Sequence, residues 1–391
     1  MSATLPLLDT DSTPPAAPTK RGILDVPAEE LRAWLAARGQ PPMRAAQVRR
    51  QVLINRAATF EEMSDLPKIL RAELAEAFDL FSTRVERHLT AADGTHKLVL
   101  RLADGGMIEA VLIQDDGRAT ACVSTQVGCG MGCVFCASGL NGVVRNLTSG
   151  EIIEQLVRLR NLTPKPVAAE KNPISRSPSR KEVREGATTG LADRLTHIVV
   201  MGMGEPLANL DNLLDALAVA GDKNGLGIGA RHVTISTVGL PVKIARLAEV
   251  GKQYSLAVSL HAPNDELRTR IVPTNDKTGL DAILAAADAY FAETGRQVTY
   301  EYVVLGGLND LPEHARQLAG LLAGRKAHVN LIPWNNVDGL PYQRPHDADL
   351  EYLIDTLRKS AVSVKVRKRK GSEIDAACGQ LRRKVEGERP V

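Results

Sequence analysis

The sequence lacks the marks of a membrane protein or of a secreted one. No uncharged apolar run in its 391 residues reaches the ~18 residues that a membrane-spanning helix needs. Residues 1–22 contain neither the basic start nor the apolar stretch of a secretion signal. We therefore expect a soluble, cytoplasmic protein that makes no contact with a membrane.

Cysteine and net charge are also scarce. The chain has five cysteines, and three of them fall within residues 129–136. In a reducing compartment such clustering indicates a metal site or catalysis rather than disulfide cross-links. The net charge of +3 does not by itself indicate nucleic-acid binding, although residues 165–184 and 364–370 are rich in Lys and Arg. Either stretch could bind phosphate groups, but solvated surface charge is the simpler explanation of each one taken alone.

The amino-acid composition is typical of a globular protein, with 44% apolar and 24% charged residues. Residues 1–21, rich in Thr, Pro and Ala, predict a disordered tail. Apolar residues at three- and four-residue spacing predict helices over 28–38, 43–54 and 66–77, and hence a small helical accessory domain over 22–82. Residues 83–116 change to alternation, which predicts a β-hairpin extension with strands at 97–101 and 107–113 around a turn at 104–106.

Strands and helices alternate through the rest of the chain, residues 117–391. Most of the expected strands are followed by an apolar-periodic helix, and they lie at 119–126, 195–202, 232–237, 254–260, 298–305 and 329–332. Six such units predict an α/β domain on a parallel sheet, doubly wound or curved into an open barrel, with ligands at the carboxyl ends of the strands. Residues 164–190 combine Pro, Ser and charge without periodicity and predict an exposed insertion.

The clustered cysteines directly follow the first of these strands. Cys129, Cys133 and Cys136 have the spacing C-x3-C-x2-C. Three thiolates from one loop can bind three irons of a [4Fe-4S] cluster and leave the fourth iron open to another ligand, such as S-adenosylmethionine (SAM). Phe135 would shield one side of the cluster from water. A structural zinc site is the alternative, but no fourth Cys or His lies suitably close downstream.

Other residues that could take part in catalysis or binding have simple structural explanations when each is taken alone. Gly204-Glu205 follows the second strand and could be an ordinary strand-ending turn. A lone His261 is more often structural than functional, and Cys122, inside the first strand, is typical of a buried core position. Cys378 differs, because its polar, glycine-flanked surroundings give it no comparable packing role.

The chain resembles the RlmN/Cfr family of radical-SAM RNA methyltransferases over about residues 22–384. The resemblance rests on separate motifs along the chain: Cys129-x3-Cys133-x2-Cys136, Arg145-Asn-Leu-Thr148, Gly204-Glu-Pro206, Ser236-Thr-Val-Gly239, Ser259-Leu-His-Ala262, Glu301-Tyr302, Asn330-Leu-Ile-Pro-Trp-Asn335 and Ala376-Ala-Cys-Gly-Gln-Leu381. It implies a partial (β/α)6 radical-SAM barrel that holds a [4Fe-4S] cluster on the three clustered cysteines. It also implies a SAM site lined by Gly204, Glu205, Ser236, Ser259, Leu260, His261 and Asn335.

The resemblance also assigns catalytic roles. It implies that Cys378 becomes S-methylcysteine, that Cys122 is the second thiol, which forms a disulfide with Cys378 on product release, and that Glu109 accepts a proton. From the residues alone, Glu109 is merely a polar residue on the outer face of a strand. The implied reaction is methylation of carbon 2 of an adenosine in 23S rRNA, and in some members of the adenosine next to the anticodon in tRNA, with two SAM molecules consumed per turnover.

The implied partners are these RNAs and an electron donor such as a flavodoxin- or ferredoxin-type reductant, and we expect a monomer. The target base must be extruded to reach the barrel. Arg44, Arg49 and Arg50 of the accessory domain and the cationic 364–370 strand are the expected RNA clamps.

Two features depart from the family, and three alternatives stay open. The 164–190 insertion is longer and more basic than the family pattern, and Asn336 stands where a proline is common. The alternatives are a Cfr-type enzyme acting on carbon 8, a radical-SAM enzyme acting on something other than RNA, and a non-catalytic protein that binds zinc and RNA. The Cys122/Cys378 pair counts against the second, because hydrogen abstraction alone does not require it.

Overall fold

The computed structural model describes residues 20–115, 117–164, 192–335, 337, 339–367, 370–377 and 379–381. Cys378, Asn336, residues 165–190 of the expected insertion and nearly all of the expected N-terminal tail lie outside the described residues. The last two tail residues are described. Lys20 donates through Nζ to the Ala75 carbonyl at 2.7 Å, and Arg21 belongs to a short strand, β1 (Arg21–Gly22), paired with β2 (Phe78–Asp79).

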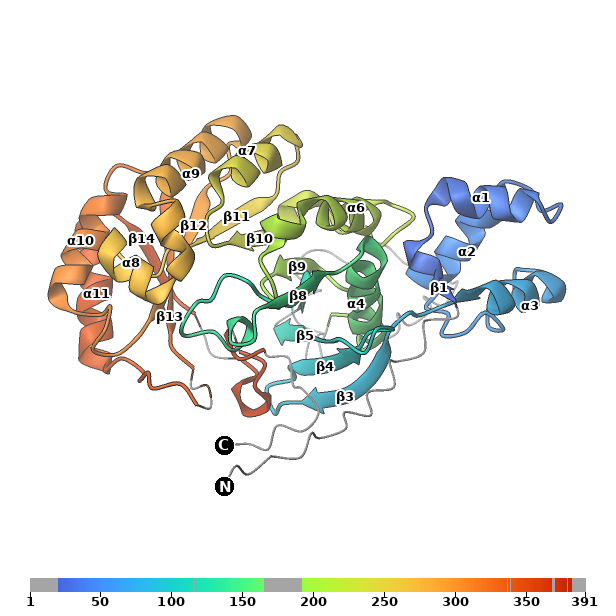
Figure 1. Cartoon of the computed structure of the whole chain (residues 1–391), viewed down its shortest axis with the longest axis horizontal. Coiled ribbons are helices and arrows are strands. Elements are labelled where there is room, and N and C mark those ends of the chain that lie inside the picture. The colour runs from blue at the N-terminus through green and yellow to red at the C-terminus, as the bar shows by residue number, and fades with distance from the viewer. Residues whose placement is uncertain are drawn as a thin grey trace, which may run out of the picture.

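The three expected N-terminal helices are confirmed as α1 (Ala28–Ala36), α2 (Met43–Leu53) and α3 (Lys68–Ala77), and they lie at one end of the molecule (Figure 1). Each buries apolar residues four positions apart, as in the pair Leu31 and Leu35 and the pair Leu70 and Leu74, because such residues share one helix face. The helices are joined to the rest of the chain through Asp25, whose carboxylate accepts the Gly150 backbone N–H at 2.8 Å.

One ten-stranded sheet forms the centre of the described part of the chain, in the order β14-β13-β12-β11-β10-β9-β6-β5-β4-β3. From β6 to β14 all neighbours are parallel, and from β3 to β6 all are antiparallel. The strands are β3 (Arg84–Thr90), β4 (His96–Arg101), β5 (Met107–Asp115), β6 (Arg118–Cys122), β9 (His197–Val200), β10 (Val233–Thr237), β11 (Ser255–Ser259), β12 (Val298–Val304), β13 (Ala327–Pro333) and β14 (Ser363–Val366).

The six expected barrel strands are confirmed as β6 and β9 to β13, and β14 extends them. The expected hairpin is confirmed as β4 and β5, with Gly106 donating its N–H to Asp104 in the turn at 2.9 Å. It is larger than the sequence predicts, because β3 adds a further antiparallel strand on the outer edge of the sheet. The hairpin is also not a separate layer, since β5 pairs with the first barrel strand.

Helices cover the outer face of the parallel strands (Figure 1). They are α4 (Ser149–Asn161), α6 (Leu210–Gly221), α7 (Pro241–Glu249), α8 (Asp265–Ile271), α9 (Leu280–Thr294), α10 (Pro312–Leu322) and α11 (Asp347–Lys359). A capping box begins α4, since Thr148 Oγ1 accepts the Glu151 N–H at 3.1 Å and the Glu151 carboxylate accepts the Thr148 N–H at 2.9 Å.

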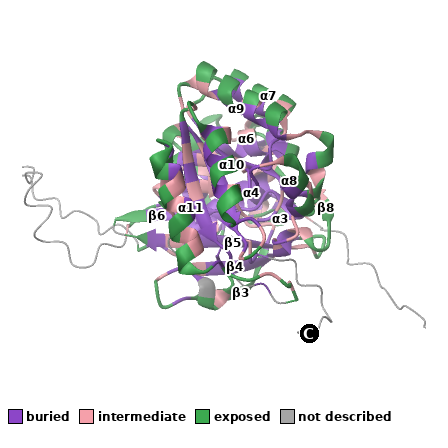
Figure 2. Cartoon of the chain, turned by 90° about the vertical axis from the view of Figure 1, so that its left-hand side faces the viewer, coloured by how far each residue is buried: buried purple, intermediate pink, exposed green. Residues whose placement is uncertain are grey.

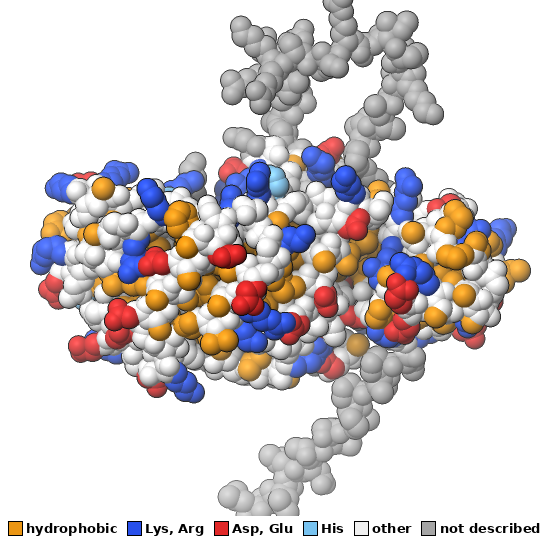
Figure 3. Space-filling view, turned by 90° about the horizontal axis from the view of Figure 1, so that it is seen from above, with side chains coloured by type: hydrophobic (Ala, Val, Ile, Leu, Met, Phe, Trp, Pro, Cys, Tyr) orange, Lys and Arg blue, Asp and Glu red, His pale blue; other side chains and the backbone are white. Residues whose placement is uncertain are grey.

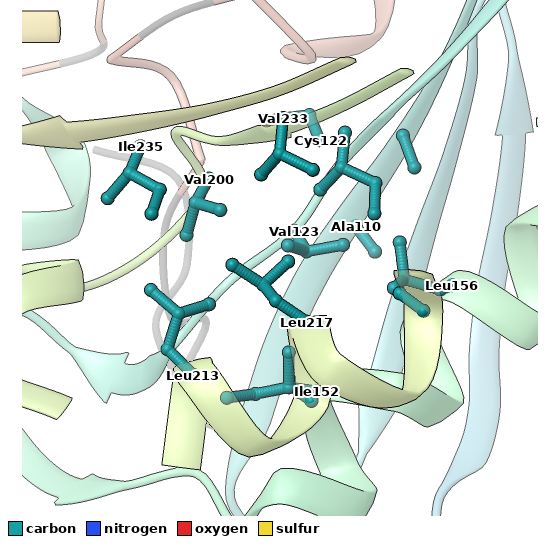
Figure 4. Packing of buried hydrophobic residues seen from close by; sticks show 14 of the residues in the cluster. Ala110, Cys122, Val123, Ile152, Leu156, Val200, Leu213, Leu217, Val233 and Ile235 are labelled. Carbon is teal, nitrogen blue, oxygen red and sulfur yellow. The ribbon is translucent and has the colours of Figure 1, made fainter. Parts of the chain in front are cut away.

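The core lies between these helices and the sheet. Ile152 and Leu156 of α4 and Leu213 and Leu217 of α6 point toward strand residues such as Val200 (Figure 4). Each fully buried side chain of this size stabilises the fold by about 1.5–3 kcal/mol. Figure 2 shows the buried residues on the strands and inner helix faces, with exposed residues on the outer faces. Among the described residues, no helix has both the length and the apolar character needed to cross a membrane.

A buried carboxylate joins α4 to the segment between the accessory helices and the sheet. Glu154 has a side chain only 1% exposed. Its two oxygens accept the backbone N–H groups of Ser82 and Thr83 at 2.8 and 3.0 Å, their hydroxyls at 2.8 and 2.6 Å, and Arg158 Nε at 2.9 Å. The predicted boundary between residues 82 and 83 therefore lies at a well-bonded junction, and the division into domains remains a prediction.

Replacement of this carboxylate should destabilise the whole chain. Glu154→Leu leaves the Ser82 and Thr83 donors and the Arg158 guanidinium without their acceptor, so we expect a loss of about 3–5 kcal/mol in the free energy of unfolding. Denaturant unfolding measures it. Asp211→Leu is the control, because Asp211 pairs with Arg246 on the surface with its side chain 70% exposed, where such a pair contributes about 0–1 kcal/mol. Equal effects of the two substitutions would contradict the assigned role of Glu154.

Candidate active site

The three clustered cysteines line one pocket at the carboxyl ends of the parallel strands. The same pocket is lined by several residues that the sequence assigns to SAM, namely Gly204, Glu205, Ser236, Ser259 and His261. Two other assigned residues, Leu260 and Asn335, do not line the pocket that the described residues form. The structure thus brings most of the predicted site together around Cys129, Cys133 and Cys136.

A glycine sets the shape of the cysteine loop. Gly128 ends β7 (Gln126–Gly128) with φ +78°, and a Cβ there would lie 2.0 Å from the Gly142 carbonyl oxygen. That same oxygen accepts the Cys129 N–H at 2.9 Å. The close approach of two backbone segments requires glycine at this position. Phe135 in the loop is buried and packs edge-on against His261, with ring centroids 4.8 Å apart.

Gly128→Ala should weaken cluster binding. The new methyl group collides with the Gly142 carbonyl, and the positive φ adds about 1–3 kcal/mol of backbone strain. We expect iron content to fall severalfold while far-UV circular dichroism stays close to that of the wild type. Gly142→Ala is the matched control, since Gly142 has φ +63° but nothing within 4 Å of its added Cβ. If both variants lose iron equally, backbone strain rather than the collision is responsible.

Burial disfavours ionisation of the cysteine thiols unless a positive charge lies nearby. Burial, together with the charges of Cys136 and Glu205, raises the pKa of the Cys129 thiol to about 12. Burial, with the charges of Cys136 and Cys129, also holds the pKa of the Cys133 thiol well above its usual range. Since metal ligation requires thiolates, these three sulfurs fit a polynuclear cation such as an iron–sulfur cluster.

Glu205 is held firmly beside these cysteines. Its carboxylate accepts backbone N–H groups from Val238 at 2.9 Å and Leu207 at 3.0 Å. Burial raises the pKa of Glu205 to about 7, against the lowering effect of these hydrogen bonds. Gly204, just before it, has φ +104°, and a Cβ there would lie 2.6 Å from the Gln126 side chain. Glycine at this position therefore lets the backbone beside Glu205 pack closely against Gln126.

The remaining assigned SAM residues differ in how they could contribute. Ser236 and Ser259 have hydroxyl oxygens 3.5 Å apart. His261 has φ +60°, and its Nδ1 accepts the Val303 N–H at 3.0 Å, while burial lowers its pKa to about 3, so the ring is neutral. Leu260 is fully buried. Asn335 is buried, and its Oδ1 finds no hydrogen-bond partner within the described ranges.

Arg268 is a residue of the site that sequence reasoning missed. It lies on α8, only 1% exposed, and donates through Nε to the Leu260 carbonyl at 3.0 Å and through one terminal nitrogen to the Val238 and Ser259 carbonyls at 2.5 and 3.0 Å. It thereby ties together the ends of β10 and β11, where the predicted SAM residues stand. Its sequence context, Asp265-Glu-Leu-Arg-Thr-Arg270, resembles a surface helix and contains no signal of this role.

Two further residues, Glu301 and Arg367, line the pocket without having been assigned to the site. Glu301, on β12, accepts Asn330 Nδ2 at 2.8 Å, and burial raises its pKa while the charge of Arg367 lowers it. Arg367, just after β14, lines the pocket with it. Glu301 and Asn330 belong to motifs that carry the family resemblance, and this membership could have identified them as site residues from the sequence.

The comparisons with known proteins agree with this geometry. The model for the radical SAM superfamily matches residues 123–319, and the model for the ribosomal RNA large subunit methyltransferase N-terminal domain matches residues 22–80. The chain is 50% identical over 379 residues to a probable dual-specificity RNA methyltransferase RlmN of Rhodopirellula baltica, covering 97% of this chain and 95% of that protein. It is 40% identical to the corresponding protein of Geobacillus kaustophilus, covering 94% of each.

A crystal structure gives the same result. A radical SAM methyltransferase from Sphaerobacter thermophilus superposes with a TM-score of 0.82 at 40% identity, covering 93% of this chain and 99% of that one. The chain belongs to the RlmN family of radical SAM methyltransferases. The resemblance drawn from its motifs and the radical-SAM barrel are therefore confirmed, and the alternative of a non-catalytic zinc protein is wrong. Radical SAM proteins use a [4Fe-4S] cluster and SAM, and Cys129, Cys133 and Cys136 are the residues here that fit the cluster.

Of the two expected family thiols, the structure describes Cys122. Cys122 is the last residue of β6, buried, and pairs across the sheet with Val111 of β5. Cys378 is outside the described residues, but its neighbours are not. Gly379 lines the pocket and accepts the Ala137 N–H at 2.8 Å, and the Leu381 carbonyl accepts Ser138 Oγ at 2.5 Å. The residues that follow Cys378 are thus hydrogen-bonded to Ala137 and Ser138, which directly follow the last cysteine of the loop.

Glu109 does not lie on the outer face of its strand, so the simple structural explanation of this residue is wrong. It is only 3% exposed on β5, where the register places it diagonally from Cys122 on the same face of the sheet. Its carboxylate lies 3.3 Å from Lys97 Nζ. A buried carboxylate diagonal to Cys122 suits the proton-accepting role that the family implies.

The expected RNA clamps are not equally available. On α2, Arg44 and Arg49 are half-buried and donate to the Asp65 and Val26 carbonyls, whereas Arg50 is exposed. Arg367, within the cationic stretch, is half-buried and lines the pocket. On the face seen in Figure 3, basic side chains occur at several places, interspersed with acidic and apolar ones. The clamp assignments remain predictions.

Proposed function

We propose that this protein methylates carbon 2 of an adenosine in 23S rRNA, and of the adenosine next to the anticodon in tRNA, through an S-methyl group on Cys378. The observation that carries the proposal is that one pocket is lined by the cysteine loop and by Gly379, the residue after Cys378, while the segment before Cys378 is bonded through Lys97 to the buried face that carries Glu109 and Cys122. The names of the relatives, dual-specificity RNA methyltransferases, support the substrate class.

The chemistry explains why two thiols and a carboxylate are needed. Carbon 2 of adenine is electrophilic, so it cannot attack the methyl group of SAM as a nucleophile. When bound, the cluster supplies and takes back single electrons, and SAM supplies the methyl group and, once cleaved, the radical that removes a hydrogen atom from it. The Cys378 thiolate accepts the methyl group in the first, polar step. After hydrogen removal, the methylene radical on its sulfur adds to the adenine ring and links protein to RNA.

Release then depends on residues of this chain. Glu109 takes the proton of the ring carbon, and the bonding pair returns to the ring. The Cys122 thiolate attacks the Cys378 sulfur, an S–S bond forms, and the S–C bond breaks with its electron pair left on the methylene carbon, which takes up a proton to become the methyl group. The disulfide must be reduced before the next turnover, which fits the proposed cytoplasmic location and a flavodoxin- or ferredoxin-type electron donor. We also propose that the protein acts as a monomer.

Nucleoside mass spectrometry tests the proposal. Anaerobically reconstituted protein is incubated with SAM, a reductant and unmodified 23S rRNA or tRNA, beside Cys378→Ala. We expect 2-methyladenosine with the wild type and none with the variant. Formation of 8-methyladenosine would assign the protein to the carbon-8 branch instead. An intact cluster that cleaves SAM but yields no methylated adenosine would overturn the RNA substrate.

A further inference from the structure

A buried ion pair lies on the face of the sheet that carries Glu109 and Cys122, and the proposed reaction does not use its cation. Lys97, on β4, is 4% exposed, and its Nζ lies 3.3 Å from Glu109 Oε1. The register pairs Lys97 with Val111 and Glu109 with Val99, so the two charged side chains are diagonal neighbours on one face.

Lys97 also contacts the segment that carries Cys378. Its Nζ donates to the Asp375 carbonyl at 3.1 Å. Asp375 has φ +51° and stands in a turn in which the Ala376 N–H donates to the Gly371 carbonyl at 2.9 Å. One ammonium group therefore bonds at once to the strand of the proposed base and to the backbone three residues before the catalytic cysteine.

Stability alone does not account for a lysine here. Burying an ammonium group costs several kcal/mol, and apolar residues of similar volume often replace buried ion pairs without loss. The residues around the pair on this face, Val99 and Val111, are apolar and buried, so an apolar side chain would suit the site. What an apolar residue cannot supply is a fixed direction for the carboxylate and a hydrogen bond to the incoming segment.

We propose that Lys97 is a positioning residue for product release, which orients the Glu109 carboxylate toward the ring proton and holds the Cys378 segment against β4 and β5. The inference rests on the proposed function. Methyl transfer to Cys378 and cleavage of SAM do not involve Glu109, so Lys97 should matter chiefly after RNA is linked to the protein. A misplacement of the base by about 1 Å can lower the rate of the step that it serves on the order of 10²-fold.

Two variants of Lys97 separate its two contacts. Lys97→Gln removes the ion pair but keeps a donor for the Asp375 carbonyl, and Lys97→Met removes both. The control is Lys252→Gln, at an exposed lysine far along the chain. Three quantities are measured for each protein: S-methylation of Cys378 by peptide mass spectrometry, 5′-deoxyadenosine from SAM, and the ratio of covalent protein–RNA adduct to methylated adenosine.

For Lys97→Gln we expect S-methylcysteine and first-turnover 5′-deoxyadenosine at wild-type levels, with the ratio of adduct to product raised at least tenfold. Lys97→Met should raise the ratio further, and if it does not fold, Lys97→Gln alone decides. A wild-type ratio of adduct to product in Lys97→Gln would overturn the proposal, and an equal fall in S-methylcysteine, 5′-deoxyadenosine and methylated adenosine at that ratio would reveal a merely structural role. If the wild type itself makes no methylated adenosine, the proposed function fails first, whatever Lys97 does.

Discussion

Cys122→Ala should leave the protein covalently attached to its RNA. In the proposed reaction the Cys122 sulfur is the nucleophile that breaks the bond between the Cys378 sulfur and the methylene carbon. All earlier steps use other residues, so the first turnover proceeds up to the adduct and stops there. We expect release of methylated adenosine to fall by at least about 10²-fold, while SAM is still cleaved.

The adduct is measured as a slow-migrating protein–RNA band that resists denaturation. The chain has only five cysteines, and three of them belong to the cluster loop, so Cys378 is the remaining thiol to which RNA can be linked. Peptide mapping after nuclease digestion should therefore find a nucleotide on Cys378, and the double variant with Cys378→Ala should form no adduct. Normal release of methylated adenosine from Cys122→Ala would refute the resolving role.

A structural role of Cys122 predicts a different outcome. Its side chain lies in the main apolar core, and Cys122→Ala there removes one sulfur atom, a change that costs on the order of 1 kcal/mol in stability. Such a loss lowers all activities together and does not accumulate an intermediate. Accumulation of the adduct with an almost unchanged unfolding midpoint thus separates chemistry from packing.

The sequence predicts the elements of this fold well wherever their periodicity is strong. The barrel strands are short apolar runs and the covering helices have apolar faces, so both are recognised locally. The exception is β3, whose residues are almost all exposed. An edge strand without a buried face has no alternation to recognise, and only its pairing with β4 shows that it is a strand.

The candidate site was predictable to the extent that its residues share a short motif. Cys129, Cys133 and Cys136 are separated by fixed spacings. Ser236 lies near the carboxyl end of β10, and Glu205 and His261 lie in the loops that follow β9 and β11. Arg268 and Lys97 are recognisable only in three dimensions, because each acts on backbone carbonyls or a carboxylate that are distant in the sequence. Glu109 illustrates the same limit, because the pattern of its own strand does not show that the side chain is buried beside Lys97 of the neighbouring strand.

Arg268→Met should abolish most SAM cleavage, although Arg268 does not line the pocket. The guanidinium donates to the carbonyls of Val238, Ser259 and Leu260 and to Asn275 Oδ1 at 2.6 Å. Methionine fills much of the same volume but satisfies none of these acceptors, and each buried acceptor left without a donor costs about 1–3 kcal/mol. The ends of β10 and β11 should then separate, moving the residues predicted to hold SAM.

We expect SAM affinity to weaken at least about tenfold and formation of 5′-deoxyadenosine to fall on the order of 10²-fold. Equilibrium binding to the reconstituted protein and a single-turnover cleavage assay measure the two effects. Burial lowers the pKa of Arg268 to about 10, so the group stays charged at neutral pH and its loss is the loss of a cation. That cation also lowers the pKa of the Cys133 thiol, so a smaller decrease in iron content should accompany the loss of SAM binding.

The helix itself provides the control. Arg270 lies two residues further along α8 and is exposed, so Arg270→Met tests the loss of the same side chain without the loss of the carbonyl network. Arg270→Met should bind and cleave SAM as the wild type does. If Arg268→Met also behaves as the wild type, the strand ends are held by the sheet alone. If both variants lose activity equally, the charge of α8 matters rather than its bonds to β10 and β11.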